Sequence, residues 1–283
     1  MFKFRLILSS SRPISWINTA YPFALAYLLT GQTAASVFVI GTVYFLIPYN
    51  LLMYGVNDVF DYESDIQNPR KGGVEGAKVA KKYHSFVLRA ATLINIPFLL
   101  YLLIIGSLAS NIVLTMVTFF VIAYSAPPLR FKERAFLDSV TSSLHFVGPA
   151  IFAISLAQPR FDQLPIIVAF FLWGMASHAF GAVQDITFDR KAGIGSIATI
   201  IGAKWTVNFA IILYTLSALV LSVYSTALVP IALCVMLYAL NIHPYRAVSD
   251  KKSAITNIAW RRFIWLNWLT GAVVTITTII LRT

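Results

Sequence analysis

The stretch VFVIGTVYFLIPYNLLMYGVNDVFDYESD (residues 37–65) is a long apolar run that ends in three carboxylates. About 20 mostly apolar residues are enough for a helix to cross the roughly 30 Å hydrocarbon core of a bilayer. Asp58, Asp61 and Asp65 follow at offsets of three and four residues, which places them within about 60° of arc on one helix face. This stretch predicts a membrane-spanning helix whose end presents clustered acids, with the amide of Asn57 beside them.

The composition of the whole chain fits the same class of protein. Its 283 residues are 58% hydrophobic and only 12% charged, whereas a soluble domain carries roughly 25% charged residues. The single cysteine, Cys234, lies in an apolar run and cannot form an intrachain disulfide; it is expected to be a buried apolar residue. The low share of charged residues argues for a multi-pass membrane protein rather than a soluble globular fold.

Runs long enough to span a membrane predict an all-α, multi-pass protein with nine transmembrane helices in one bundle around a central cavity. We expect one domain over residues 1–283, because no linker or low-complexity segment divides it. The expected spans are residues 14–31, 35–57, 84–106, 109–126, 138–157, 164–185, 205–222, 226–241 and 257–281.

The distribution of the basic residues predicts the orientation of these spans in the membrane. With nine spans, 20 of the 22 Lys and Arg fall in segments on one side of the membrane, and only Arg160 and Arg282 fall on the other. The positive-inside rule then places the N-terminus and the long loops in the cytoplasm of a cell-membrane protein. The net charge of +11 follows from this topology and from anionic lipid, so no nucleic-acid partner is needed to explain it.

A second acidic cluster closes the sixth span, where Asp185 and Asp189 lie four residues apart on one helix face. Both clusters belong to the cytoplasmic ends of even-numbered spans, so we expect them to face each other across one mouth. Carboxylates gathered near the bilayer repel one another and need a cation. Oxygen ligands without His or Cys favour Mg²⁺, which shares phosphate oxygens, so a diphosphate is the expected third component. The simpler alternative is that both clusters are solvated helix ends.

These residues resemble the UbiA superfamily of intramembrane prenyltransferases. The NDxxDxxxD motif of that family is matched by residues 57–65, and its second Asp motif by Asp185-Ile-Thr-Phe-Asp189. The second motif is shorter here, because His178 stands in the neighbourhood where related members carry a further Asp. Within the superfamily, residues 11–203 are most similar to the lycopene elongase branch, whose members add C5 prenyl units to the ends of a C40 carotenoid.

The resemblance implies a Mg²⁺-dependent transfer of a dimethylallyl group from its diphosphate to lycopene, with or without hydration. Implied metal ligands are Asp58, Asp61, Asp65, Asp185 and Asp189. Since five acids, about two Mg²⁺ and a diphosphate leave excess negative charge, basic side chains must balance it, and Arg130 and Lys132 are the first candidates. With Asp61, Asp65 and Asp185 they form the predicted catalytic set. The predicted substrate-binding residues are Arg12, Asn57, Lys71, Tyr124, His178 and Arg190.

Two other functions remain open at this stage. The acceptor of the prenyl group is either lycopene or an aromatic quinone precursor or other lipid. A secondary transporter would also use intramembrane acids and broken helices, although its acids would be expected at mid-bilayer rather than at cytoplasmic helix ends.

Overall fold

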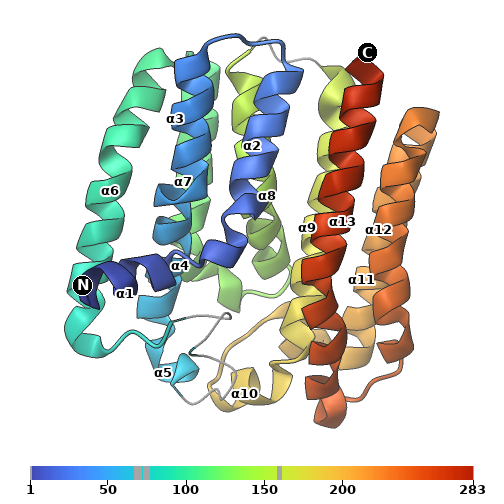
Figure 1. Cartoon of the computed structure of the whole chain (residues 1–283). Coiled ribbons are helices and arrows are strands. Elements are labelled where there is room, and N and C mark those ends of the chain that lie inside the picture. The colour runs from blue at the N-terminus through green and yellow to red at the C-terminus, as the bar shows by residue number, and fades with distance from the viewer. Residues whose placement is uncertain (1, 67–71, 73–76, 158–160, 283) are drawn as a thin grey trace. The chain divides into compact units, whose positions relative to one another are not determined.

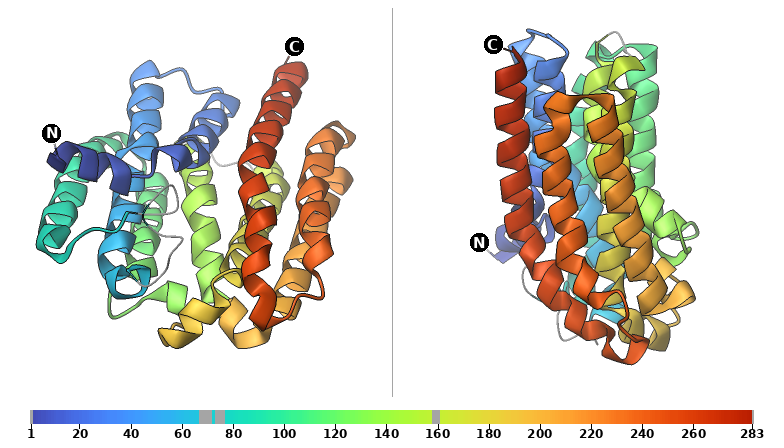
Figure 2. Two further views of the ribbon diagram at one scale, coloured as in Figure 1. Left: turned by 60° about the horizontal axis from the view of Figure 1, so that its bottom comes forward. Right: turned by 90° about the vertical axis from the view of Figure 1, so that its right-hand side faces the viewer.

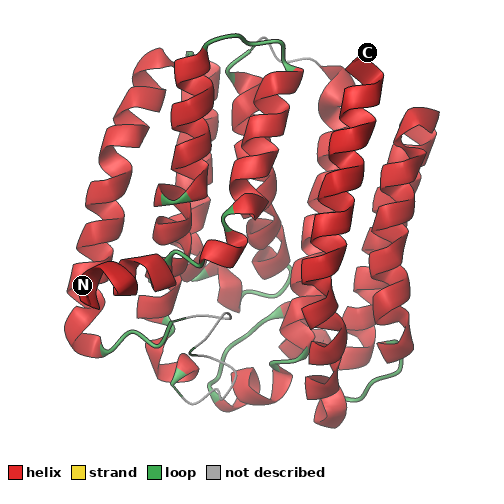
Figure 3. Ribbon diagram, in the orientation of Figure 1, coloured by secondary structure: helices red, strands yellow, loops and turns green. Residues whose placement is uncertain are grey.

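The computed structural model describes residues 2–66, 72, 77–157 and 161–282, and these residues form helices and connecting turns without a strand (Figure 3). The chain divides into two compact units, one of residues 1–131 with 144–160 and the other of residues 132–143 with 161–283. Helix α8 (Leu137–Ser155) contributes its first two turns to the second unit and the remainder to the first. The expectation of a single domain stays a prediction.

The first unit is built around α4, which contacts α6, α7, α3 and α1. The short helix α1 runs crosswise to α6 (Figure 1). Three aromatic rings from different helices pack together in the core of the first unit. They belong to Phe23, Phe45 and Phe152, and their centroids are 5.1–6.1 Å apart. Its helices besides α8 are α1 (Phe2–Ser10), α2 (Ile17–Leu29), α3 (Ala35–Leu46), α4 (Pro48–Phe60), α5 (Tyr62–Asp65), α6 (His84–Ile105) and α7 (Leu108–Ser125).

The second unit is built around α11, which packs against α9 and α12. Helices α11, α12 and α13 run side by side (Figure 2). Tyr214, Tyr238 and Phe263 form the aromatic centre of this core, with ring centroids 5.2–6.4 Å apart. Its helices besides α8 are α9 (Leu164–Val183), α10 (Ile186–Lys191), α11 (Ile197–Tyr224), α12 (Val229–Ile242) and α13 (Asn257–Arg282).

Short 3₁₀ helices connect the longer ones. They are Pro13–Ser15, Lys81–Tyr83, Phe131–Glu133, Phe161–Gln163, Thr226–Leu228, His243–Tyr245 and Asp250–Thr256. Cys234 is buried in α12 and forms no disulfide, as predicted.

Each of the nine predicted spans corresponds to a helix or a helix pair. Eight are long and apolar enough to cross a bilayer, and the ninth, α2, is a shorter apolar helix of 13 residues. The span 35–57 corresponds to α3 and α4 together, and Pro48 begins the second of these helices. One predicted boundary was wrong. The span expected to begin at residue 205 begins at Ile197, because Ser196 and Thr199 form a capping box there.

Candidate active site

The acidic end of α4 is buried within the first unit. Asp58, Asp61 and Asp65 are 1%, 9% and 7% exposed, although ionised carboxylates are rarely buried without partners. The helix is interrupted at Asp61, between α4 and α5, but the bonds from Asp61 N to Asn57 O (2.9 Å) and from Asp65 N to Asp61 O (2.8 Å) keep the helical repeat. The three acids therefore follow one another at helical spacing, as predicted.

Arg12 approaches this acidic end from the segment before α2. Its Nη2 donates to Asp58 Oδ1 at 2.8 Å and to Asn57 Oδ1 at 3.5 Å, and its guanidinium lies 4.2 Å from the ring centroid of Tyr54. Burial by itself lowers the pKa of Arg12, but the combined interactions with Asp58, Tyr54 and Asp65 outweigh burial and raise that pKa above its ordinary value. The guanidinium thus remains charged and is held between a carboxylate and an aromatic face.

Asn57 connects two members of the site. Its Nδ2 donates to Asp61 Oδ2 at 2.6 Å and to Ser125 Oγ at 3.0 Å. Ser125 ends α7 and is fully buried. The amide predicted to lie beside the acids thereby ties the end of α4 to the end of α7.

Arg130 reaches the same acids from the turn after α7. Its Nη2 lies 3.8 Å from Asp61 Oδ1, and its backbone has a φ of 40°, a left-handed conformation that is costly for a residue with a side chain. Pro127 and Pro128 prevent α7 from continuing. The turn therefore directs a cation back toward the acidic end of α4.

Tyr124 lies one residue before Ser125, on α7. Its ring meets that of His145 on α8 edge to face, with centroids 4.9 Å apart, and His145 Nε2 lies 3.3 Å from Phe120 O. The structure thus gives Tyr124 a packing contact with a buried histidine. Its predicted role in substrate binding stays a prediction.

In the second unit, Asp185 and Asp189 repeat the pattern of the first acidic motif. Asp185 lies at the break between α9 and α10, and Asp189 N donates to Asp185 O at 2.9 Å. In both motifs a long helix is followed by a short helical extension, and an aspartate stands at the break. The two acids belong to a different unit from Asp58, Asp61 and Asp65, so the expectation that the clusters face each other stays a prediction.

Arg190 has structural partners that the sequence did not suggest. Its Nη1 donates to Asp250 Oδ2 at 2.7 Å, and its Nε and Nη2 donate to Thr199 O at 3.1 and 2.8 Å. These bonds join α10, the first turn of α11 and the segment before α13. If Arg190 binds substrate as predicted, it must do so in addition to holding these three segments together.

His178, predicted to bind substrate, belongs to a polar group that the sequence reasoning missed. Its Nδ1 lies 3.1 Å from Ser139 Oγ, and Ser139 Oγ lies 3.4 Å from Asp138 Oδ1. Asp138 is fully buried at the start of α8 and accepts from Ile197 N at 2.8 Å. The sequence feature that could have identified this polar group is an acid beside a serine at the beginning of an apolar span.

Two further cations, Lys132 and Lys71, are predicted to act at this site. Lys132 lies in the 3₁₀ helix Phe131–Glu133, and its catalytic role stays a prediction. Lys71 lies outside the described residues. Tyr54 and Ser125, in contrast, touch the site although neither was selected. Tyr54 stands four residues before Asp58, one helical turn away, and this spacing was the signal that could have identified it.

Comparison with known proteins identifies the chain. The model of the UbiA prenyltransferase family matches residues 19–276. The chain belongs to the UbiA prenyltransferase family. It is therefore a prenyltransferase and an integral multi-pass membrane protein, and the transporter alternative is set aside.

Relatives and solved structures agree with this assignment. A lycopene elongase/hydratase from Corynebacterium glutamicum is 49% identical, with 98% of this chain and 97% of the relative covered. A protein of the same name from Halobacterium salinarum is 35% identical, with 78% and 79% covered. A UbiA homologue from Archaeoglobus fulgidus, solved with DMAPP and Mg²⁺, superposes with a TM-score of 0.69 at 16% identity, covering 94% of this chain and 99% of the other; this last likeness shows the fold.

The UbiA homologue bound to Mg²⁺ raises the question of whether the residues present suit that ion. The buried polar side chains at the end of α4 are carboxylates, and guanidinium groups pair with Asp58 and Asp61. Hard oxygen donors are the ligands that Mg²⁺ prefers. Among the described residues, no three His, Cys, Asp or Glu side chains are grouped so that they could hold a metal ion by themselves. The donor types fit a Mg²⁺ that also takes phosphate oxygens.

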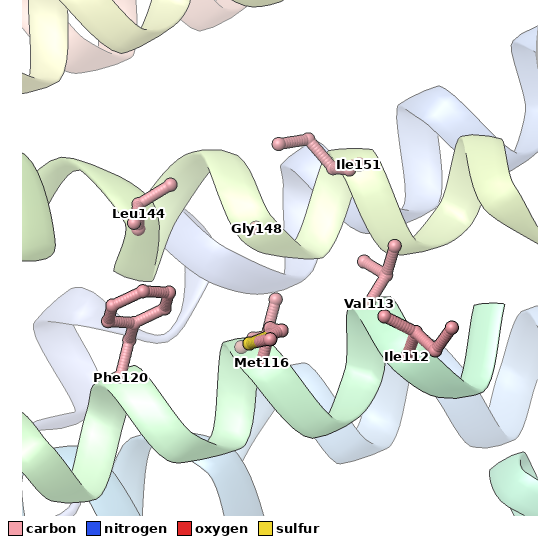
Figure 4. A pocket seen from close by; sticks show the side chains of 8 residues that line it. Ile112, Val113, Met116, Phe120, Leu144, Gly148 and Ile151 are labelled. Carbon is pink, nitrogen blue, oxygen red and sulfur yellow. The ribbon is translucent and has the colours of Figure 1, made fainter. Parts of the chain in front are cut away.

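Apolar hollows occur within the membrane-spanning part of the first unit. One, of about 180 Å³, lies between α7 and α8 and is lined by Met116, Phe120, Leu144 and Gly148 among others (Figure 4). Another, of about 280 Å³, lies between α6 and α7. The central cavity predicted for the UbiA-type bundle stays a prediction.

Proposed function

We propose that this prenyltransferase transfers a C5 dimethylallyl group from its diphosphate to the ends of lycopene, with Mg²⁺ as cofactor. The observation that carries the proposal is the buried acidic end of α4, on which Arg12 and Arg130 converge. Both arginines offer the planar, charged donors that suit a diphosphate. The choice of acceptor is supported by relatives at 49% identity that bear the name lycopene elongase/hydratase.

The reaction consists of one bond cleavage and one bond formation. The bond between C1 of the dimethylallyl group and its diphosphate oxygen breaks, and the terminal double bond of the acceptor attacks the allylic cation. The resulting tertiary cation loses a proton, or takes up water and loses a proton from it. Each addition therefore adds C5H8, or C5H10O with hydration, and releases diphosphate and one proton.

Stabilising the departing diphosphate is the main catalytic requirement. Mg²⁺, when bound, neutralises the developing negative charge, and its proposed ligands are Asp58, Asp61, Asp65, Asp185 and Asp189. Arg12 and Arg130 supply positive charge beside Asp58 and Asp61, and we assign the same task to Lys132 and Lys71. We place the mouth of the site on the cytoplasmic side of the cell membrane, because the basic residues gather on that side of the predicted topology.

The test is expression of the chain in cells that accumulate lycopene, with mass analysis of the extracted pigments. The proposal predicts pigments heavier by one or two C5 units, with or without water. Unchanged lycopene would remove this acceptor and favour an aromatic or other lipid acceptor instead.

Two variants identify the site responsible. Asp61→Ala removes a buried carboxylate and should abolish the mass shift while the protein still inserts in the membrane. Glu63→Gln is the matched control, because Glu63 lies two residues after Asp61, on α5, but is exposed and pairs with Lys81. Persistence of the shift in Asp61→Ala would contradict the proposed metal role.

A further inference from the structure

Asp138, Ser139 and His178 form a connected polar group inside the second unit. Asp138 accepts from the backbone N–H of Ile197 (2.8 Å) and of Ser139 (2.7 Å). The Ser139 hydroxyl lies 3.4 Å from Asp138 Oδ1 and 3.1 Å from His178 Nδ1. The group joins the starts of α8 and α11 to the middle of α9.

The direction of the hydrogen bonds follows from the chemistry of the three groups. The Ser139 hydroxyl donates its single proton to Asp138 Oδ1. The hydroxyl oxygen then accepts from His178 Nδ1–H, which leaves the basic lone pair of the imidazole on Nε2. In a catalytic triad a buried acid accepts directly from the histidine that it orients as a base; here the Ser139 hydroxyl lies between the acid and the histidine.

The position of His178 on α9 relates it to the second acidic motif. His178 precedes Asp185 by seven residues, which corresponds to about 700° of helical rotation and therefore to nearly the same face of the helix. The rise over seven residues is about 10 Å. His178 therefore lies about two helical turns before the second acidic motif.

We propose that His178 accepts the proton released when the prenylated cation collapses to product, with Ser139 and Asp138 as positioning residues. This inference rests on the proposed prenyl transfer to an alkene. When the cation loses a proton, a C–H bond beside the cationic carbon breaks, its electron pair forms the new double bond, and the proton goes to Nε2. When water adds, its oxygen forms the C–O bond and its proton goes to the same nitrogen.

The experiment measures two outputs of the purified enzyme in lipid nanodiscs supplied with Mg²⁺, dimethylallyl diphosphate and lycopene. Released diphosphate reports ionisation of the donor, and elongated pigment reports completion of the reaction. In His178→Ala we expect the pigment to fall by about 10²-fold or more, the usual contribution of a general base. Diphosphate release should change by only a few-fold, with dimethylallyl alcohol as the product of the uncoupled cation.

Chemical rescue distinguishes a base from a structural residue. Added imidazole should restore part of the pigment formation by His178→Ala, and substituted imidazoles of higher pKa should restore more. The matched control is Ser143→Ala, which removes another α8–α9 hydrogen bond, from Ser143 Oγ to Phe171 O (2.7 Å), and should keep diphosphate release and pigment formation coupled.

Three results would overturn the inference. The first is a His178→Ala variant in which diphosphate release still yields as much elongated pigment as in the wild type. The second is an equal loss of diphosphate release and pigment in that variant, without rescue, which would mark His178 as structural. The third is a wild-type enzyme that forms no elongated pigment, which would overturn the proposed function as well.

Discussion

At the residue scale, two arginines meet the acids of α4 from backbone positions of unusual geometry. Arg12 and Arg130 have φ values of 50° and 40°, although a left-handed backbone costs a residue with a side chain of the order of 1–3 kcal/mol. Such positions persist where the surroundings fix them, and they gather at functional sites. Here the fixing contacts are with Asp58 and Asp61.

The pair of Arg12 and Asp58 yields a stability prediction. Its side chains are 15% and 0% exposed, so Arg12→Ala removes the guanidinium that compensates a buried carboxylate. We expect the free energy of unfolding to fall by about 3–5 kcal/mol, measured by denaturation in detergent. The double variant Arg12→Ala/Asp58→Asn should recover part of the loss. Equal stability of the single and double variants would argue against this pair.

Much of the site could be predicted at this scale, because carboxylates at helical spacing after an apolar run are visible in the sequence. Tyr54, Ser125 and Asp138 were missed for different physical reasons. The ring of Tyr54 beneath a guanidinium and the hydroxyl of Ser125 at a helix end reach the site through tertiary contacts, and helical periodicity does not predict such contacts. Asp138 resembles an ordinary acid in a first helical turn, and only its complete burial sets it apart.

At the element scale, α11 is kinked at Gly202, where φ is 80°. Asp250 Oδ1 accepts a hydrogen bond from Ala203 N at 2.7 Å just after the kink. Arg190 Nη2 donates a hydrogen bond to Thr199 O just before it. A carboxylate thus satisfies an N–H that the kink leaves without a helical partner. The early start of α11 could have been read from Ser196 and Thr199, whereas the kink depends on a contact between distant segments.

This kink can be tested with two glycine substitutions. A Cβ at Gly202 would lie 3.1 Å from Asp250 Oδ1, whereas a Cβ at Gly193, where φ is also positive (70°), would have nothing within 4 Å. Both substitutions place a side chain at positive φ. Gly202 (φ 80°, ψ 164°) also lies in a backbone region that is essentially restricted to glycine, and only Gly202→Ala disturbs the cap. We expect Gly202→Ala to lower the melting temperature more than Gly193→Ala. Equal shifts would contradict the role of Asp250.

At the scale of the whole molecule, the positive-inside argument predicts on which side of the membrane each connection lies. In a Cys234→Ala background, Ala109→Cys is predicted to face outward and Lys252→Cys the cytoplasm. Both native residues are exposed in the structure. A membrane-impermeant maleimide added to intact cells should label the first variant only. Labelling of Lys252→Cys alone would reverse the topology.

The number of spans was predictable because the thickness of the bilayer sets a minimum length for apolar runs. The start of the span at Ile197 was missed, because the capping box at Ser196 acts locally within a run that looks continuous. The meeting of distant helices around one substrate was inferred only from topology.

The account depends most on a single Mg²⁺-diphosphate site that is shared by both acidic motifs. Equilibrium binding of labelled dimethylallyl diphosphate to the purified protein in Mg²⁺ tests this directly, with Asp61→Asn, Asp185→Asn, their combination and Glu63→Gln as the control. A shared site predicts one equivalent bound by the wild type and by Glu63→Gln. It also predicts a strong loss of affinity in each single Asp variant and little further loss in the double variant. Undiminished binding in either single variant, or losses that simply add, would contradict it.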